Sequence, residues 1–293
     1  MKPYKHILVG INYTDASRHA LLKAEQIARS SGGKLTACHV VMMPELDEFT
    51  AFYSIEHQEM MKAAQSSLEG FVKEVLGENH SARCVVSEGI PHYEIVSLAN
   101  DGDYDLLVLG DDDHADDSKK SAQFAIKCLR FATMPTLLVN RPHEEHKQTI
   151  AACIDFSNST NSILAHAAHF AAIGDSAIDL IHACRPPWLR PERLRYQTNV
   201  FEDQGQKEQF REILQGQLAG IRQSASSLVA AEITTTPIED ENPVHALIQH
   251  LSDSPCGLVV IGRVGKGLKG IVSDFLGGTA ETIIRHVHHP ILI

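Results

Sequence analysis

The sequence lacks any run of apolar residues that approaches the ~18 needed for a membrane-spanning helix. Its start, MKPYKHILVGINYTDAS, offers only a short apolar run before polar residues follow, unlike an export signal. Positive charge is also scarce, because 26 Lys and Arg residues face 37 Asp and Glu residues, for a formal net charge of −11. Such an acidic chain is poorly suited to nucleic acid or an anionic membrane. We therefore predict a cytoplasmic protein with no membrane or nucleic-acid partner.

Cysteine is sparse and never clustered, since none of the six cysteines forms a CxxC pair. This spacing argues against a zinc finger and against a disulfide framework. Buried, reduced thiols are the favoured interpretation. Disorder and low complexity are excluded as well, because 43% of the residues are apolar and 22% are charged, as in folded globular proteins.

The chain repeats itself once, and 293 residues suit two domains of about 150 residues each. The offset between the copies grows from 143 to 155 residues along the chain. One clear match pairs HILVGINYTDAS (6–17) with TIAACIDFSNST (149–160). A second pairs EGIPHYEIVSLANDGDYDLLVLG (88–110) with EDENPVHALIQHLSDSPCGLVVIG (239–262). We predict one domain over residues 1–142 and a second over residues 148–293, joined by a polar linker.

Short β-branched runs alternate with segments of helical period in both copies, which is typical of parallel sheets with crossover helices. We expect an α/β fold made of two tandem copies of a doubly wound, five-stranded parallel sheet. The expected strands are 6–11, 34–41, 83–87, 105–109, 136–139, 149–154, 177–183, 231–237, 257–261 and 290–293. Sheets of this kind bind ligands beyond the carboxyl ends of their strands, so functional residues should follow the strands.

Two features follow strands of the second copy. Asp155 comes directly after the first expected strand, and a glycine-rich stretch at 262–270 follows the fourth. Glycines let main-chain N–H groups approach an anion, and Gly277-Gly278-Thr279 opens a predicted helix whose amino end is partly positive. This arrangement predicts a phosphate cradle, with a flexible connector as the alternative. Clustered positive charge is supplied by Arg263, Lys266 and Lys269.

The glycine pattern resembles the nucleotide motif of the universal stress protein family, G-x2-G-x9-G-[ST]. The chain reads Gly262-x2-Gly265, then eleven residues, then Gly277-Gly278-Thr279, so its spacer is two residues longer. Neither a P-loop nor a dinucleotide GxGxxG fingerprint is present at the corresponding strand ends. Each half resembles one such domain, and the whole resembles the tandem universal stress proteins of bacteria, with their adenine nucleotide α-hydrolase-like fold.

The resemblance implies a site for ATP or ADP in the second domain, with an accompanying Mg²⁺ left open. It places Asp155 near the adenosine, Cys153 two residues before it, the main chain of Ala183 at the adenine, and Ile261 just before the glycine loop. The residues implied to bind the nucleotide are Cys153, Asp155, Ala183, Ile261, Gly262, Gly265, Gly277, Gly278 and Thr279.

The first copy lacks these features, because Asn12 replaces the carboxylate and no glycine follows Gly110 before the second domain. Aspartates crowd the following loop and would repel a polyphosphate. We predict no nucleotide there, and favour a solvated acidic loop over a cation site that includes His114. The aspartates are Asp111, Asp112, Asp113, Asp116 and Asp117.

Signals for metal binding and catalysis are weak. The densest histidine cluster, at 286–289, places neighbours on different faces of a helix end, which suits three ligands to one ion poorly. His166 and His169 lie on a helix with an apolar stripe and are more typical of packing residues. Ser157 follows Asp155 without a predictable base, so any ATP cleavage would be slow and would use bound water.

We interpret the chain as a stress-response protein that binds ATP or ADP in its second domain as a regulatory ligand and that contacts an unidentified protein partner; homodimerisation is left open. The alternative is a scaffold or chaperone-like protein that binds no nucleotide. An ATP pyrophosphatase is disfavoured, because DFSNST stands where that class has an SGGxDS-type loop. The Met- and aromatic-rich segment 42–61 suits core packing or, alternatively, a groove for an apolar ligand.

Overall fold

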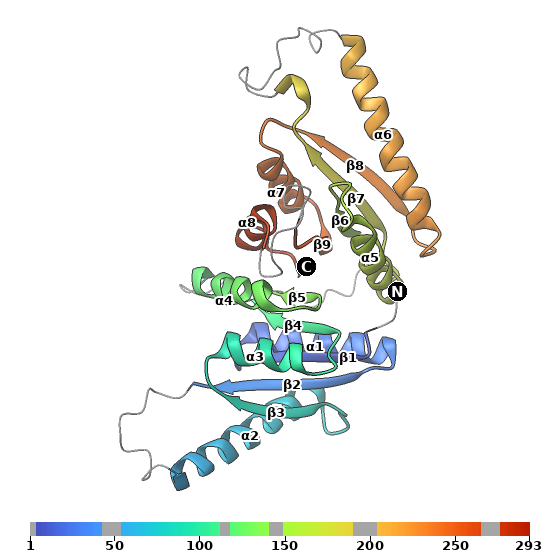
Figure 1. Cartoon of the computed structure of the whole chain (residues 1–293). Helices are drawn as coiled ribbons and strands as arrows, with labels where there is room; N and C mark the ends of the chain where they lie inside the picture. Colours follow the sequence, from blue (N-terminus) through green and yellow to red (C-terminus); the bar gives the residue numbers. More distant parts are fainter. Residues whose placement is uncertain (1–3, 43–53, 112–117, 141–148, 190–203, 265–275) are drawn as a thin grey trace. The chain divides into compact units, whose positions relative to one another are not determined.

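The computed structural model describes residues 4–42, 54–111, 118–140, 149–189, 204–264 and 276–293 (Figure 1). These residues form two compact units. The first unit contains the described part of residues 4–140 together with Pro290–Ile293, and the second contains the described part of residues 149–264 together with Gly277–His289. Within the described parts, no helix combines the length and the apolar character that crossing a membrane requires.

The first unit alternates strands with helices and ends with a strand from the far end of the chain. Its sheet has the order β3-β2-β1-β4-β5-β10, with parallel pairs up to β5. Its elements are β1 (His6–Ile11), α1 (Asp15–Ser31), β2 (Lys34–Val41), α2 (Ser54–Leu76), β3 (Arg83–Glu88), α3 (Pro91–Asp101), β4 (Leu106–Gly110), α4 (Ser118–Phe131), β5 (Thr136–Val139) and β10 (Ile291–Leu292).

The second unit repeats this alternation around a parallel sheet in the order β9-β6-β7-β8. Its elements are β6 (Thr149–Cys153), α5 (Thr160–Gly174), β7 (Ile178–Cys184), η1 (Pro187–Leu189), α6 (Gln204–Ser226), β8 (Ile233–Glu239), α7 (Pro243–Asp253), β9 (Cys256–Ile261) and α8 (Gly278–His286). The predicted α/β class and the duplicated fold are confirmed.

Continuous apolar runs explain the central strands. Leu8 and Val9 of β1 and Leu107 and Val108 of β4 are fully buried, although neighbouring side chains point to opposite faces of the sheet. Such runs are typical of parallel strands that are covered on both faces. The core of the first unit is therefore centred on these two strands, and their carboxyl ends open toward the loops that follow them.

The last strand differs from the expectation of an all-parallel sheet. β10 pairs antiparallel with β5 of the first unit, with Ile291 opposite Leu138 and Leu292 opposite Leu137. The main-chain N–H and C=O groups of Thr136 each bond to Ile293 at 3.0 Å. The pairing satisfies main-chain groups that β5 would otherwise present along an open edge. Hydrophobic pattern alone predicted the strand, but it could not give its partner.

Candidate functional site

The carboxyl ends of three strands meet at one place in the second unit. Cys153, the last residue of β6, lies in register with Ile181 of β7 on one side and Ile261 of β9 on the other. Chain connections leave β6 toward both neighbours, so this is the point where the order of the sheet reverses. In open α/β sheets that position is the usual place for a ligand.

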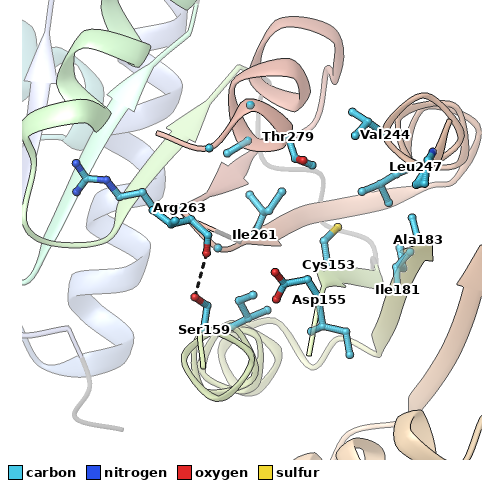
Figure 2. Close-up of a pocket in the computed structure, with 18 residues that line it drawn as sticks. Cys153, Asp155, Ser159, Ile181, Ala183, Val244, Leu247, Ile261, Arg263 and Thr279 are labelled. Carbon is cyan, nitrogen blue, oxygen red and sulfur yellow. Dashed lines mark hydrogen bonds between the residues drawn. The ribbon is translucent and has the colours of Figure 1, made fainter. Parts of the chain in front are cut away.

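A cavity of about 380 Å³ lies there (Figure 2), within the size range of small-molecule sites. Eight of the nine residues predicted to bind nucleotide line it, and Gly265 lies outside the described residues. The structure thus brings together strand ends, a helix start and apolar side chains. The lining residues are Cys153, Ile154, Asp155, Ser159, Ile163, Ile181, Ala183, Pro243, Val244, Leu247, Ile261, Gly262, Arg263, Val264, Gly277, Gly278, Thr279 and Ala280.

Asp155 is held in place by the turn that follows β6. The main-chain N–H of Ser157 donates to Oδ1 of Asp155 at 3.0 Å, which is the hydrogen bond of an Asx turn. Phe156 between them adopts a φ of 56°, and its ring lies 4.3 Å from the ring of His182. The half-buried carboxylate is thereby fixed on the rim of the cavity.

His182 ties the ends of β6 and β7 together. Its Nδ1–H donates to the carbonyl of Ile154 at 2.8 Å, and the N–H of Ile154 donates to the carbonyl of Ile181 at 2.9 Å. His182 is buried. Because Ala183 follows directly, this link also fixes the main chain that is implied to recognise adenine.

Gly262 allows β9 and the start of α5 to approach closely. A Cβ atom at Gly262 would lie 3.2 Å from the Cβ of Ser159 and 3.5 Å from Cδ1 of Ile163. The hydroxyl of Ser159 donates to the carbonyl of Val264 at 3.3 Å. Ser159 was missed at the sequence level, although its place ahead of an apolar helical stripe is the signal of a helix start.

The amide of Gly277 is already used within the protein. Its N–H donates to the carbonyl of Arg263 at 2.9 Å, which joins the two described ends of the glycine-rich stretch. A phosphate would therefore meet other donors than this one. The spacing of glycines in the sequence gives no sign of such a loop-closing hydrogen bond.

The start of α8 offers those donors. The first N–H groups of a helix have no acceptor within the helix, and the described residues provide no side-chain cap at Gly277. Gly278, Thr279 and Ala280 all line the cavity. A Cβ at Gly278 would meet nothing within 4 Å, so there is open space beside the first residue of the helix. The partial positive charge of the helix adds to the attraction for an anion.

Positive side chains contribute little to the described cavity. In Figure 2 the side chain of Arg263 runs away from Cys153, Asp155 and Thr279. Lys266 and Lys269 lie outside the described residues. Main-chain amides, and not a cluster of cations, are therefore the anion-attracting groups that the described part of the site contains.

Helix α7 supplies an apolar wall that the sequence analysis did not identify. Pro243, Val244 and Leu247 line the cavity and face the strand ends. Burial raises the pKa of Cys153 well above its ordinary value, so its thiol is neutral at physiological pH and serves as an apolar surface. One side of the cavity is thus suited to a flat apolar group.

Two histidines of the cluster at 286–289 bond to main-chain carbonyls. Nδ1–H of His286 donates to Thr282 at 2.8 Å, and Nε2–H of the buried His289 donates to Leu251 at 2.9 Å. Among the residues that the structure describes, no three His, Cys, Asp or Glu side chains gather as a metal site would require. His114 and the loop aspartates Asp112, Asp113, Asp116 and Asp117 lie outside those residues.

The model of the "Universal stress protein family" matches the chain twice, at residues 3–140 and 147–293. A universal stress protein from Archaeoglobus fulgidus superposes with a TM-score of 0.62 at 13% identity, covering 98% of this chain and 97% of that one. A putative universal stress protein from Pseudomonas aeruginosa UCBPP-PA14 gives 0.62 at 17% identity, covering 99% and 93%. At such identities the superpositions show the fold. No curated protein is similar enough to count as a match.

Proposed function

We propose, from the premise that this chain belongs to the universal stress protein family, that its second unit binds ATP or ADP as a regulatory ligand in a cytoplasmic stress response. The observation that carries the proposal is the shared cavity. The uncapped start of α8, the carboxylate of Asp155 and the apolar wall of α7 all line one space at the point where the sheet order reverses.

Each part of a nucleotide has a chemically matching part of the cavity. Ile181, Val244 and Leu247 suit the flat face of a base, and the main chain at Ala183 suits its polar edge. The carboxylate of Asp155 can accept hydrogen bonds from ribose hydroxyls. The N–H groups of Gly278 and Thr279 suit phosphate oxygens.

An accompanying Mg²⁺ would depend mainly on the nucleotide. Asp155 is the one carboxylate among the described residues that line the cavity. Mg²⁺ requires six oxygen ligands and commonly takes them from phosphates and water, with one or two carboxylates. The described residues therefore fit Mg²⁺ only as a partner of bound phosphates and water, and Asp155 would be its single protein ligand only in place of the ribose contact.

Regulation requires binding without rapid turnover. In the described lining Cys153 is a neutral thiol, histidine is absent, and the one carboxylate, Asp155, is assigned above to the ribose, so we assign no general base to the phosphates. Binding to the folded state alone stabilises a protein by about 2.7 kcal/mol when the ligand is at a hundredfold excess over its Kd. Occupancy can thus change stability, and with it the contacts to a protein partner.

The test uses two substitutions at Gly278 in the full chain, because a side chain there meets open space. In G278D a negative charge faces the phosphates, so the Kd for ATP should rise at least tenfold. The same charge at the first position of a helix favours the helix, so the melting temperature without ligand should not fall. G278S adds the hydroxyl of the family motif, and its Kd should be equal to or lower than that of the parent protein.

The matched control is Q123D, which places the same charge at the corresponding exposed position of α4 in the first unit. It should leave the Kd for ATP unchanged in isothermal titration calorimetry. An ATP affinity that G278D and Q123D affect equally would contradict the proposed site. A parent protein that shows no binding and no thermal shift with millimolar ATP or ADP would favour the scaffold or chaperone-like alternative.

A further inference from the structure

The first unit contains a second cavity at the corresponding place in its own sheet. Its volume is about 720 Å³, larger than that of the cavity in the second unit. It opens at the carboxyl ends of β1, β2 and β4, the strands equivalent to β6, β7 and β9. The lining residues are Gly10, Ile11, Asn12, Thr14, His39, Val40, Val41, Met42, Pro91, Ile95, Leu109, Gly110 and Phe124.

The turn after the first strand is the same in both units, but the first unit has an uncharged asparagine where the second has an aspartate. Oδ1 of Asn12 accepts hydrogen bonds from the N–H of Thr14 at 3.3 Å and from its hydroxyl at 2.7 Å. Asp155 forms the same turn in the second unit through the N–H of Ser157. Nδ1–H of His39 donates to the carbonyl of Ile11 at 2.8 Å, as His182 does to Ile154. The frame of the site is therefore conserved between the two units, whereas the carboxylate is not.

In the first unit an aromatic side chain stands where the second unit has the start of the helix that would hold phosphates. Phe124 lies eleven residues before Pro135, and Thr279 lies eleven residues before Pro290, so the two correspond. α8 begins one residue before Thr279, but α4 begins at Ser118, well before Phe124. The start of α4 is therefore displaced along the chain, and Phe124 lines the cavity in place of the threonine.

Charge around the cavity disfavours an anion. The described lining contains no Lys or Arg side chain. Asp111, the next residue after the lining residue Gly110, adds a negative charge. Most of the side chains that line the cavity are apolar, with few polar groups among them, which is typical of sites for small organic molecules.

We propose that the first unit binds an uncharged small molecule with an apolar body, through the cavity between Asn12, His39, Ile95 and Phe124. The proposal is independent of nucleotide binding in the second unit. Asn12 and Thr14 supply polar contacts at one end, and Val40, Met42 and Phe124 supply the apolar surface. The first unit is then a receptor in its own right, with a ligand class different from that of the second.

The experiment titrates the full chain with N-phenyl-1-naphthylamine, an uncharged fluorescent probe, in the presence of saturating ATP. We expect saturable binding of one probe molecule per chain. The anionic probe 8-anilinonaphthalene-1-sulfonate should bind at least tenfold more weakly. F124D should raise the Kd for the uncharged probe at least tenfold, and F124L should change it less than threefold.

Two further variants separate a lost site from a lost fold. M42D changes a lining side chain that is 71% exposed, so the fold should tolerate it while the Kd for the probe rises at least fivefold. L228D places the same charge on a side chain of the second unit that is 54% exposed and lines neither cavity, and it should leave the Kd for the probe unchanged. The proposal is overturned if the probe binds without saturation, if F124D and M42D leave its Kd unchanged, or if both probes bind equally well.

Discussion

At the scale of single residues, two aromatic residues have the same unusual main-chain conformation. Tyr13 and Phe156 have φ angles of 64° and 56°, in the left-handed region that non-glycine residues seldom adopt. Their rings lie 4.7 Å and 4.3 Å from those of His39 and His182. Contact with the ring of a histidine that is itself hydrogen-bonded offsets part of the strain, and both candidate sites use the resulting sharp turn.

Lys23 of α1 is a residue whose replacement should stabilise the protein. Desolvation lowers its pKa from 10.5 to about 8, and its Nζ donates to Oε1 of Gln26 at 3.0 Å. The folded state therefore holds this proton less tightly than the unfolded state, so the contribution of Lys23 to stability rises as pH increases from about 8 to 10.5. At pH 7 the charged form is penalised, and K23M should raise the free energy of unfolding by roughly 1–3 kcal/mol.

Denaturant unfolding at pH 7 and pH 10.5 measures this effect. The gain in K23M should shrink at the higher pH, where the parent lysine is largely neutral in the folded state. K127M changes an exposed lysine of α4 and should move stability little at either pH. A K23M protein that is less stable than its parent at pH 7 would contradict the assigned desolvation.

At the scale of elements, the ends of neighbouring strands are linked by histidine. H182F keeps an aromatic ring against Phe156 but removes the N–H that bonds the buried carbonyl of Ile154. Leaving that carbonyl without this donor should cost about 1–3 kcal/mol of stability. The main chain at Ala183 should also lose its fixed position, so we expect a three- to tenfold weaker affinity for ATP.

The matched change in the first unit is H39F, which removes the equivalent bond to Ile11. It should lower stability by a similar amount in thermal unfolding and leave the Kd for ATP unchanged. Equal ATP affinities of H182F and the parent protein, measured by calorimetry, would show that the link stabilises the sheet without positioning the site.

Most elements could be predicted because local pattern dominates them. The expected strand 149–154 is β6, 177–183 is β7, and 257–261 is β9, each within one or two residues. Parallel register then explains why Asp155 and Ala183 meet at one edge. Contributions from helices were harder to predict, because the side chains of Val244 and Leu247 reach the cavity only through the packing of α7. The hydrogen bond that occupies the amide of Gly277 was also not predictable, because it joins residues that are distant in the sequence and neither composition nor spacing indicates it.

At the scale of the whole molecule, residues from the far end of the sequence, in β10, pair with β5 of the first unit. Ile291 and Leu292 are 2% and 1% exposed, and they complete the sheet of the first unit beside β5. L292A should cost about 2–4 kcal/mol, as expected for truncating a buried leucine. The loss should be located in the first unit, where the N–H of Thr136 bonds to Ile293.

Hydrogen exchange followed by mass spectrometry can locate the effect. Peptides that cover β5 should lose protection in L292A, and those that cover β7 and β8 should keep it. L228A changes a leucine that is 54% exposed and should leave both sets unchanged. Protection of β5 that survives L292A would contradict the assigned pairing.

The position of β10 also sets an order of events during protein synthesis. About 150 residues separate Val139 from Ile291, which at 5–20 residues per second means roughly 8 to 30 s of translation. During that interval the amino-terminal half emerges with β5 exposed, and a nascent chain in this state offers an edge to which a chaperone could bind. Only the arrival of residues 290–293 covers this edge, so the first half finishes folding after the second has been made.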